Sequence, residues 1–152
     1  MRSVSSWLDE YGESHRNPTN ELLHFICVPA IVLAIFGLLW AIPVPAPSPW
    51  INVATLVAAL VLVYYALLSP ALAGGMLLAF VLLAFAVRAL AVLPWPLWAT
   101  SAAIFVIAWI GQFVGHALEG KRPSFFKDVQ FLLIGPLWLL AALYRRLGFA
   151  GV

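Results

Sequence analysis

The sequence contains three histidines, His15, His24 and His116, and two glutamates spaced to act with them. Glu21 precedes His24 by three positions and Glu119 follows His116 by three, so each pair would share one face of a helix. Imidazole nitrogens combined with carboxylate oxygens suit Fe(II), Mn(II) or Zn(II). Three nitrogens, or two nitrogens and one carboxylate, would bind such an ion and leave positions open for a substrate. The pattern therefore predicts a metal site, with Glu119 as a candidate ligand.

Other polar residues close to the histidines could support such a site. A side chain that hydrogen-bonds to a ligating imidazole fixes its tautomer and its orientation. We expect this role for Asn17, Asn20, Gln112 and Glu21. Lys121 and Arg122 could bind an anionic headgroup. Two plainer interpretations stay open: Glu119 pairs with one of these cations at a helix end, and the histidines are polar residues at a membrane interface.

The composition indicates a membrane protein. Of 152 residues, 64% are hydrophobic and 9% are charged, and the mean hydropathy is +1.03. A soluble domain carries roughly 25% charged residues, so this chain has too few polar groups to cover a globule in water. Its net charge of +2 is small and dispersed, which argues against a nucleic-acid partner. The single cysteine, Cys27, excludes a disulfide framework and a thiolate metal cluster.

Long apolar runs predict an all-α integral membrane protein with four transmembrane helices in the lipid bilayer. We place the spans at about 18–42, 50–68, 71–93 and 97–118, within a single membrane domain, 1–152. Asn17 and Pro18 predict the start of the first helix, as its N-cap and first helical residue.

Two segments lie outside these spans. An amphipathic stretch within residues 1–17 places Trp7, Leu8 and Tyr11 on one side, which predicts an N-terminal interfacial segment.

At the other end, a polar loop, 119–128, precedes an apolar stretch at 129–147. Gly135-Pro136 interrupts this stretch. The interruption favours a re-entrant or interfacial apolar hairpin, with a fifth span as the alternative.

Most basic residues precede the first span or follow the fourth, and the loops between spans contain none. These flanking residues are Arg2, Arg16, Lys121, Arg122, Lys127, Arg145 and Arg146. The positive-inside rule then places the N-terminus and the 119–128 loop at the cytoplasmic face. With four spans, the start of the first and the end of the fourth lie on one face, so His15, His24 and His116 would meet there. We therefore expect the metal site at the cytoplasmic face of a multi-pass membrane protein.

Two strings of residues resemble the Mpo1-like family, also known as the DUF962 family. The first is YGESHRNPTNELLHFICVP, which matches the family pattern Tyr…His-x-x-x-x-Asn-x-x-x-His at Tyr11, His15, Asn20 and His24. The second is GQFVGHALEGKRPSFFKDVQFLLIGPLWLL. It matches at Gly115, His116, Glu119, Pro123, Gln130, Gly135 and Pro136. The likeness covers nearly the whole chain, although the second and third spans match only in hydrophobic character.

The resemblance implies an Fe(II)-dependent dioxygenase that shortens 2-hydroxy fatty acids by one carbon through α-oxidation. It also implies that Fe(2+) is held by His15, His24 and His116, with Glu119 as a fourth ligand or base. A long-chain 2-hydroxy fatty acid and O2 would be the substrates. Lys121 and Arg122 would orient the carboxylate, and the acyl tail would lie among the spans. We expect a bacterial inner membrane as the location, and an oligomer is compatible with the sequence.

Other functions stay open on the residues alone. A different iron oxygenase or a metal-dependent hydrolase would use the same ligands. A b-type haem carrier would use two of the histidines as axial ligands. A non-catalytic membrane protein would carry the histidines as incidental polar residues.

Overall fold

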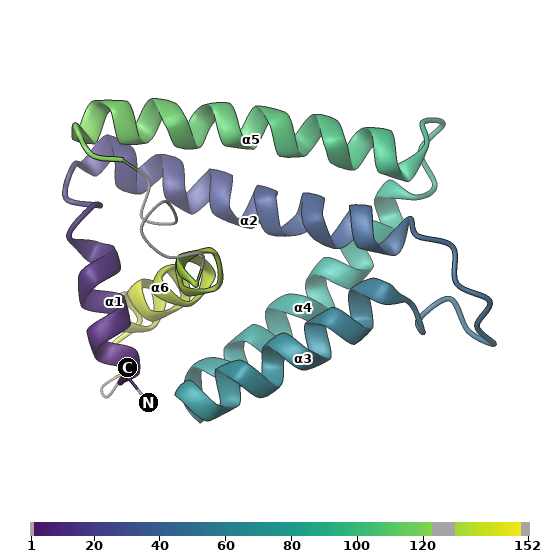
Figure 1. Cartoon of the computed structure of the whole chain (residues 1–152), viewed down its shortest axis with the longest axis horizontal. Helices are drawn as coiled ribbons and strands as arrows, with labels where there is room; N and C mark the ends of the chain where they lie inside the picture. Colours follow the sequence, from purple (N-terminus) through teal and green to yellow (C-terminus); the bar gives the residue numbers. More distant parts are fainter. Residues whose placement is uncertain (1, 123–129, 150–152) are drawn as a thin grey trace. The chain divides into compact units, whose positions relative to one another are not determined.

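The computed structural model describes residues 2–122 and 130–149, and all regular structure in these ranges is α-helical, as the sequence predicts (Figure 1). The helices are Val4–Gly12 (α1), Pro18–Trp40 (α2), Val53–Leu68 (α3), Pro70–Leu90 (α4), Leu97–Glu119 (α5) and Phe131–Arg146 (α6). The chain divides into two compact units, which we call the terminal unit (up to Pro29 and from Ala108 onward) and the central unit (Ala30–Ile107). Both α2 and α5 contribute residues to each unit.

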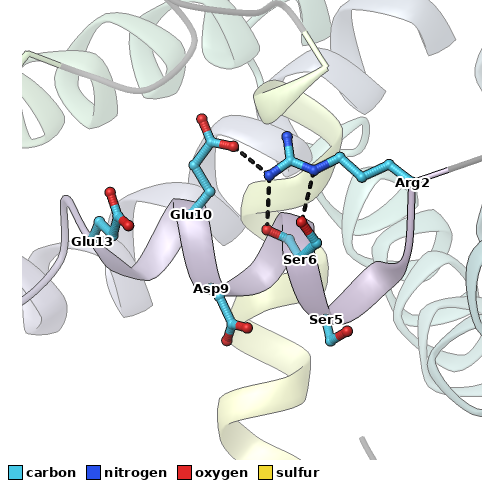
Figure 2. A pocket seen from close by; sticks show the side chains of 6 residues that line it. All are labelled: Arg2, Ser5, Ser6, Asp9, Glu10 and Glu13. Atoms are coloured by element: carbon cyan, nitrogen blue, oxygen red, sulfur yellow. Dashed lines mark hydrogen bonds and ion pairs between the residues drawn. The ribbon is translucent and has the colours of Figure 1, made fainter.

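A serine cap begins α1. The Ser3 hydroxyl accepts a hydrogen bond from the Ser6 backbone N–H at 3.3 Å, which satisfies one free amide of the first turn. The Arg2 guanidinium lies over this turn, where it donates to Ser6 and pairs with Glu10 (Figure 2). Asp9 points away from this ion pair in the same view. These contacts hold the polar side of α1.

The apolar side that the sequence predicts for α1 is present, and it is buried within the protein. Trp7, Leu8 and Tyr11 are its buried residues. The rings of Trp7 and Phe131 meet edge-on with centroids 5.2 Å apart, so this side packs against α6. The packing fixes α1 within the terminal unit and brings Tyr11 toward the histidines.

The start of α2 is as predicted. The Asn17 side-chain oxygen accepts a hydrogen bond from the Thr19 N–H at 2.9 Å, and Pro18 is the first helical residue. This cap ends the connection that carries His15 and begins the helix that carries His24.

A glycine ends α5. Gly120 has a φ of 71°, the left-handed conformation that glycine adopts without steric cost. The Lys121 N–H donates to the His116 carbonyl at 3.3 Å and the Gly120 N–H donates to the Ala117 carbonyl at 3.2 Å, which is a Schellman motif. The motif fixes the direction in which the chain leaves the helix. Of the predicted polar loop, residues 123–129 lie outside the described ranges.

Two glycines let α5 approach α2 closely in the terminal unit. A Cβ atom at Gly111 would lie 2.5 Å from the Cys27 sulfur, and one at Gly115 would lie 2.4 Å from the Asn20 side-chain oxygen. Real Cβ atoms essentially never lie this close to another atom, so a larger residue at either position would force the neighbouring side chain to shift. The spacing Gly-x-x-x-Gly is the one that membrane helices use for close contact.

The expected hairpin at 129–147 is wrong for the described part of that stretch. Residues 131–146 form one helix that continues through Gly135 and Pro136. Pro136 lies in the second turn, where its ring removes a single backbone hydrogen bond but has a φ that suits a helix. The helix therefore stays continuous through Pro136, and its Phe131 end packs against α1.

In the central unit, Ser69 and Pro70 separate α3 from α4. The Ser69 hydroxyl caps α4 by accepting from the Leu72 N–H, and Pro70 takes the first helical position. The core of the unit is apolar and contains small residues that allow close packing. Its buried cluster is Phe36, Ala54, Ala58, Ala84 and Val87.

Three helices are long and apolar enough to cross a membrane: α2, α4 and α5. The predicted second span corresponds to α3, an apolar helix of 16 residues that is shorter than these. Large apolar side chains are exposed along one stripe of α3, at Leu56, Leu60, Val63 and Leu67. Exposed apolar surface of this extent suits a lipid environment.

Candidate metal centre

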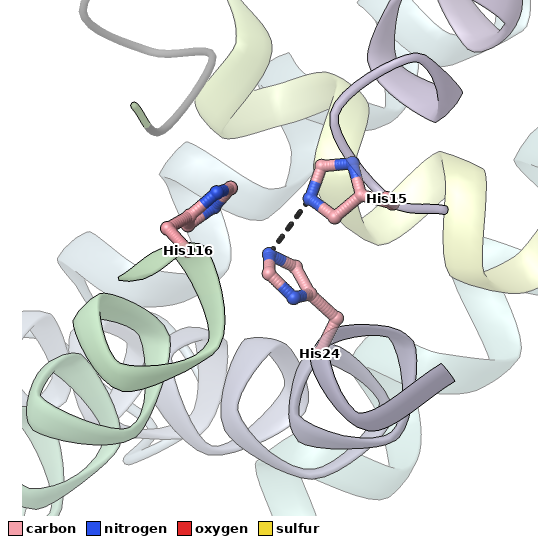
Figure 3. A group of neighbouring side chains, drawn as sticks. All are labelled: His15, His24 and His116. Carbon is pink, nitrogen blue, oxygen red and sulfur yellow. Dashed lines mark hydrogen bonds between the residues drawn. The ribbon is translucent and has the colours of Figure 1, made fainter. Parts of the chain in front are cut away.

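The terminal unit brings the three predicted histidines together (Figure 3). His15 comes from the connection between α1 and α2, His24 from the second turn of α2, and His116 from the last turns of α5. One nitrogen from each ring can be chosen so that the three lie within 4.8 Å of one another. The residues are 5%, 0% and 4% exposed, respectively. The predicted convergence of the histidines is therefore present within one unit.

Backbone carbonyls orient two of the rings. The His15 Nδ1–H donates to the Tyr11 carbonyl at 2.6 Å, and the His24 Nδ1–H donates to the Asn20 carbonyl at 2.9 Å. A carbonyl oxygen can only accept, so each Nδ1 must carry the hydrogen. The Nε2 atom of each neutral ring is then left with a free lone pair. Both histidines are thus set to act as Nε2 ligands.

These two lone pairs face each other. The Nε2 atoms of His15 and His24 lie 2.9 Å apart, with no hydrogen between them in the neutral rings. A shared proton would relieve the contact, but burial and the neighbouring His24 lower the pKa of His15 to about 3. Metal–imidazole bonds are about 2.1 Å long in zinc sites, so two nitrogens bound to one ion at roughly 90° lie about 3 Å apart. The pair therefore fits a divalent metal ion.

The third ring and a neighbouring amide also have unsatisfied polar atoms. His116 Nδ1 and Gln112 Nε2 are buried and have no hydrogen-bond partner in the described structure. The two residues are four positions apart on α5, so they lie on one face of the helix. A buried polar group without a partner is costly. These two atoms therefore suit a metal ion or a ligand bound at this face of the site. Gln112 was expected to orient an imidazole, but its side-chain nitrogen donates no hydrogen bond to one in the described structure.

Aromatic side chains enclose His15. The Tyr11 ring stacks on the His15 ring at 4.2 Å, and the Trp138 ring lies 5.3 Å from it. Gly135 makes room for the Tyr11 hydroxyl, because a Cβ there would lie 3.0 Å from that oxygen. Burial raises the pKa of the Tyr11 phenol, so its hydroxyl stays protonated. The sequence did not predict that Trp138 packs against His15 together with Tyr11.

Glu119 lies beside the three histidines but is not part of the group that can share an ion, among the described residues. Its carboxylate accepts hydrogen bonds from the backbone N–H groups of Arg16 and Asn17, at 3.0 and 2.8 Å, and from the Asn20 side chain at 3.1 Å. Asn17 and Asn20 thus lie near the site as predicted, and both contact this carboxylate.

The remaining predicted residues lie around this centre. The Lys121 ammonium donates to the Glu13 carbonyl at 2.6 Å, which ties the end of α5 to the α1–α2 connection. Arg122 is exposed. Glu21 accepts a hydrogen bond from Arg146 of α6 at 2.9 Å.

The geometry suits a single divalent metal ion better than a haem. Three neutral imidazoles can hold one divalent ion and leave its other coordination positions open. Two axial haem ligands must lie on opposite sides of a macrocycle, and the 2.9 Å between the Nε2 atoms of His15 and His24 leaves no room for one.

A family model described as 2-hydroxy-palmitic acid dioxygenase Mpo1-like matches residues 1–147. The chain belongs to the Mpo1-like family. Among Mpo1-like proteins, it is 30% identical over 153 residues to the 2-hydroxy-palmitic acid dioxygenase MPO1 of Saccharomyces cerevisiae, covering 98% of this chain and 84% of the yeast protein. No solved structure matches the chain. The matched region contains all three histidines, so the resemblance carried by the two sequence strings is confirmed.

Proposed function

We propose that this chain is an Fe(II)-dependent dioxygenase that converts a long-chain 2-hydroxy fatty acid into the acid one carbon shorter. The ion would be held by His15, His24 and His116. The observation that carries the proposal is the apposition of two Nε2 lone pairs at 2.9 Å in a buried cluster of three imidazoles. The yeast relative, named for 2-hydroxy-palmitic acid, supports the substrate class.

The proposed reaction balances without a further reductant. The C1–C2 bond of the 2-hydroxy acid breaks, C1 leaves as CO2, and C2 becomes the carboxyl carbon of the product. The acid loses four electrons, and O2 accepts them, so the other product is one water molecule. The substrate therefore supplies all the electrons.

A bound Fe(II) ion would supply the redox chemistry and the open coordination positions for the 2-hydroxy carboxylate and O2. The Tyr11 and Asn20 carbonyls keep His15 and His24 in the ligating tautomer. Tyr11 and Trp138 cover His15 and exclude water from that side. Because three imidazoles carry no charge, the ion keeps its full positive charge, which favours an anionic substrate.

Gln112 is the residue that we assign to the substrate. Its buried amide nitrogen has no partner in the described structure and lies one helical turn before His116, toward the apolar middle of α5. A substrate oxygen would satisfy this donor. The acyl tail would then lie among the apolar helices, and the reaction would take place at the cytoplasmic face of the membrane.

The test uses the full chain, purified in detergent without oxygen. Its iron content is measured first, and O2 uptake is then followed with 2-hydroxypalmitic acid. Palmitic acid and 3-hydroxypalmitic acid are the controls, because neither carries a hydroxyl on C2, the carbon that the proposed reaction converts into the new carboxyl group. We expect one iron per chain, uptake with the 2-hydroxy acid alone, and pentadecanoic acid in proportion to the O2 consumed. Absence of both iron and uptake would overturn the proposal.

A further inference from the structure

The Glu119 carboxylate contacts segments that carry all three proposed ligands. The Arg16 backbone N–H donates a hydrogen bond to this carboxylate, and Arg16 is the residue after His15. The Asn20 side-chain N–H donates a hydrogen bond to Glu119, and the Asn20 backbone carbonyl orients His24. Glu119 itself lies three residues after His116 on α5. One side chain thus joins three parts of the chain that are up to 103 positions apart.

The arrangement resembles a capping box that is completed from another helix. In a capping box, the side chain at the third helical position reaches back to the N–H of the N-cap residue. In α2 the N-cap is Asn17 and the third helical residue is Asn20. The Asn17 N–H is instead bound by Glu119 of α5, at 2.8 Å. A carboxylate at a helix N-terminus is also favoured by the helix dipole.

Further contacts strengthen the same junction. The Asn20 side-chain nitrogen that binds Glu119 also donates to the Ser14 carbonyl at 3.1 Å, next to His15. The Lys121 ammonium binds the Glu13 carbonyl. The Schellman motif at Gly120 sets the direction of Glu119 and Lys121 at the end of the helix. The end of α5 is therefore fixed to the α1–α2 connection at several points.

We propose that Glu119 is a positioning residue of the metal centre and not a ligand. Through its three hydrogen bonds it holds the His15 connection and the start of α2 at the distance from His116 that lets three imidazoles reach one ion. The inference rests on the proposed function only in taking the three histidines as metal ligands. It assigns Glu119 the role of setting metal affinity.

The experiment measures binding of Co²⁺ alone to the metal-free full chain, so it needs no catalysis. Cobalt absorption bands report the ligands, and a titration gives the affinity. In Glu119→Gln, one amide oxygen still accepts but the amide nitrogen faces a backbone N–H. We expect roughly 10- to 100-fold weaker binding, the usual effect of losing a partner outside the ligand set. The bands at saturation should keep their wild-type positions, because the ligands are unchanged.

Two more variants make the result specific. Asn20→Ala removes one of the three hydrogen bonds to Glu119, together with the one to the Ser14 carbonyl, and leaves the backbone donors of Arg16 and Asn17 in place. It should also weaken cobalt binding, and it serves if Glu119→Gln does not fold. Asp9→Asn removes an exposed carboxylate from α1 in the same unit and should bind cobalt as the wild type does.

Each outcome decides a different point. If the wild type binds no cobalt, the proposed function fails and takes this inference with it. If the wild type binds cobalt and Glu119→Gln binds it equally well, the positioning role alone is wrong. Altered bands in the saturated Glu119→Gln protein would make Glu119 a ligand and would also overturn the inference.

Discussion

The terminal and central units use the same two long helices for different purposes. Among the described residues, the buried polar side chains of the terminal unit are Ser14, His15, Asn20, His24, Gln112 and His116. The central unit has one, Ser101. In the described structure, the side-chain atoms Asn20 Oδ1, Gln112 Nε2 and His116 Nδ1 of the terminal unit have no hydrogen-bond partner, and neither has Ser101 Oγ of the central unit. The buried cluster of the central unit is built from alanine, valine and phenylalanine. Unsatisfied polar groups reduce stability, and three of these four atoms lie in the unit where chemistry is expected.

The two units also use close helix contact differently. In the central unit, Gly37 makes room for Ser101, since a Cβ there would lie 2.2 Å from the Ser101 oxygen. In the terminal unit, Gly115 makes room for Asn20, which also contacts Glu119 and orients His24. The first contact packs two helices, and the second places a proposed metal ligand. Substitutions in matched pairs can therefore separate packing from function.

The largest expected effect comes from comparing His24→Ala with Ser101→Ala. Both residues are completely buried and polar, and they lie in different units. Loss of a ligand should exceed the roughly 10- to 100-fold effect of an outer partner. We expect His24→Ala to lose its iron. Since the loss of an outer partner costs up to roughly 100-fold, the loss of a ligand should leave less than about 1% of the 2-hydroxypalmitate-dependent O2 uptake. Ser101→Ala should keep both; an active, iron-loaded His24→Ala protein would contradict the assignment.

Gly115→Ala and Gly74→Ala form the second pair. The added methyl group at Gly115 would lie 2.4 Å from the Asn20 oxygen, whereas Gly74 has nothing within 4 Å. Overpacking of this kind costs about 1–3 kcal/mol. We expect Gly115→Ala to unfold at a lower temperature and to bind less iron, and Gly74→Ala to melt at or slightly above the wild-type temperature. Equal melting temperatures and iron contents would show that α2 can shift without disturbing the histidines.

Gln112→Leu tests a smaller, more local effect. The substitution keeps the volume of the side chain but removes the buried donor that we assign to the substrate. A hydrogen bond to a charged group contributes about 1.5–3 kcal/mol, so kcat/KM for 2-hydroxypalmitate should fall by roughly 10- to 100-fold with the iron content unchanged. Phe113→Leu, at a half-exposed neighbouring position, is the control. An unchanged kcat/KM in Gln112→Leu would remove Gln112 from the substrate site.

The sequence predicted the members of the site better than their roles. The three histidines come together as expected, with His24 near the start of one long apolar helix and His116 near the end of another. The count of four spans on which that expectation depended stays a prediction. The i+3 spacing of Glu119 from His116 indicated proximity correctly. Its hydrogen bonds, however, depend on how the α1–α2 connection meets the end of α5, and no local pattern contains that information.

Other features were missed for related physical reasons. The spacing Gly111-x-x-x-Gly115 was a readable signal for close contact between α5 and another helix. Trp138 gave no such signal, because a tryptophan in an apolar run suits a membrane interface equally well. The hairpin at Gly135-Pro136 was wrong because Pro136 lies in the second turn of α6, where a proline removes only one backbone hydrogen bond, and the sequence does not show where the helix begins.

The smallest expected effect is on the pH dependence of stability, and it should also distinguish the two units. The pKa of His15 falls from its ordinary 6.5 to about 3 through burial and its neighbour His24. Between these values the unfolded chain binds a proton that the folded chain does not, so stability is full above pH 6.5 and falls as the pH drops toward 3. At pH 5 the loss from His15 is on the order of 2 kcal/mol.

The melting temperature of the metal-free protein, measured with a chelator present, should therefore be level from pH 8 to 7 and should fall below pH 6.5. His15→Gln should reduce this fall by the part that His15 contributes, since glutamine does not titrate, whereas Ser101→Ala in the central unit should leave it unchanged. A wild-type melting temperature that does not change down to pH 5 would mean that His15 takes up its proton in the folded protein as readily as in the unfolded chain.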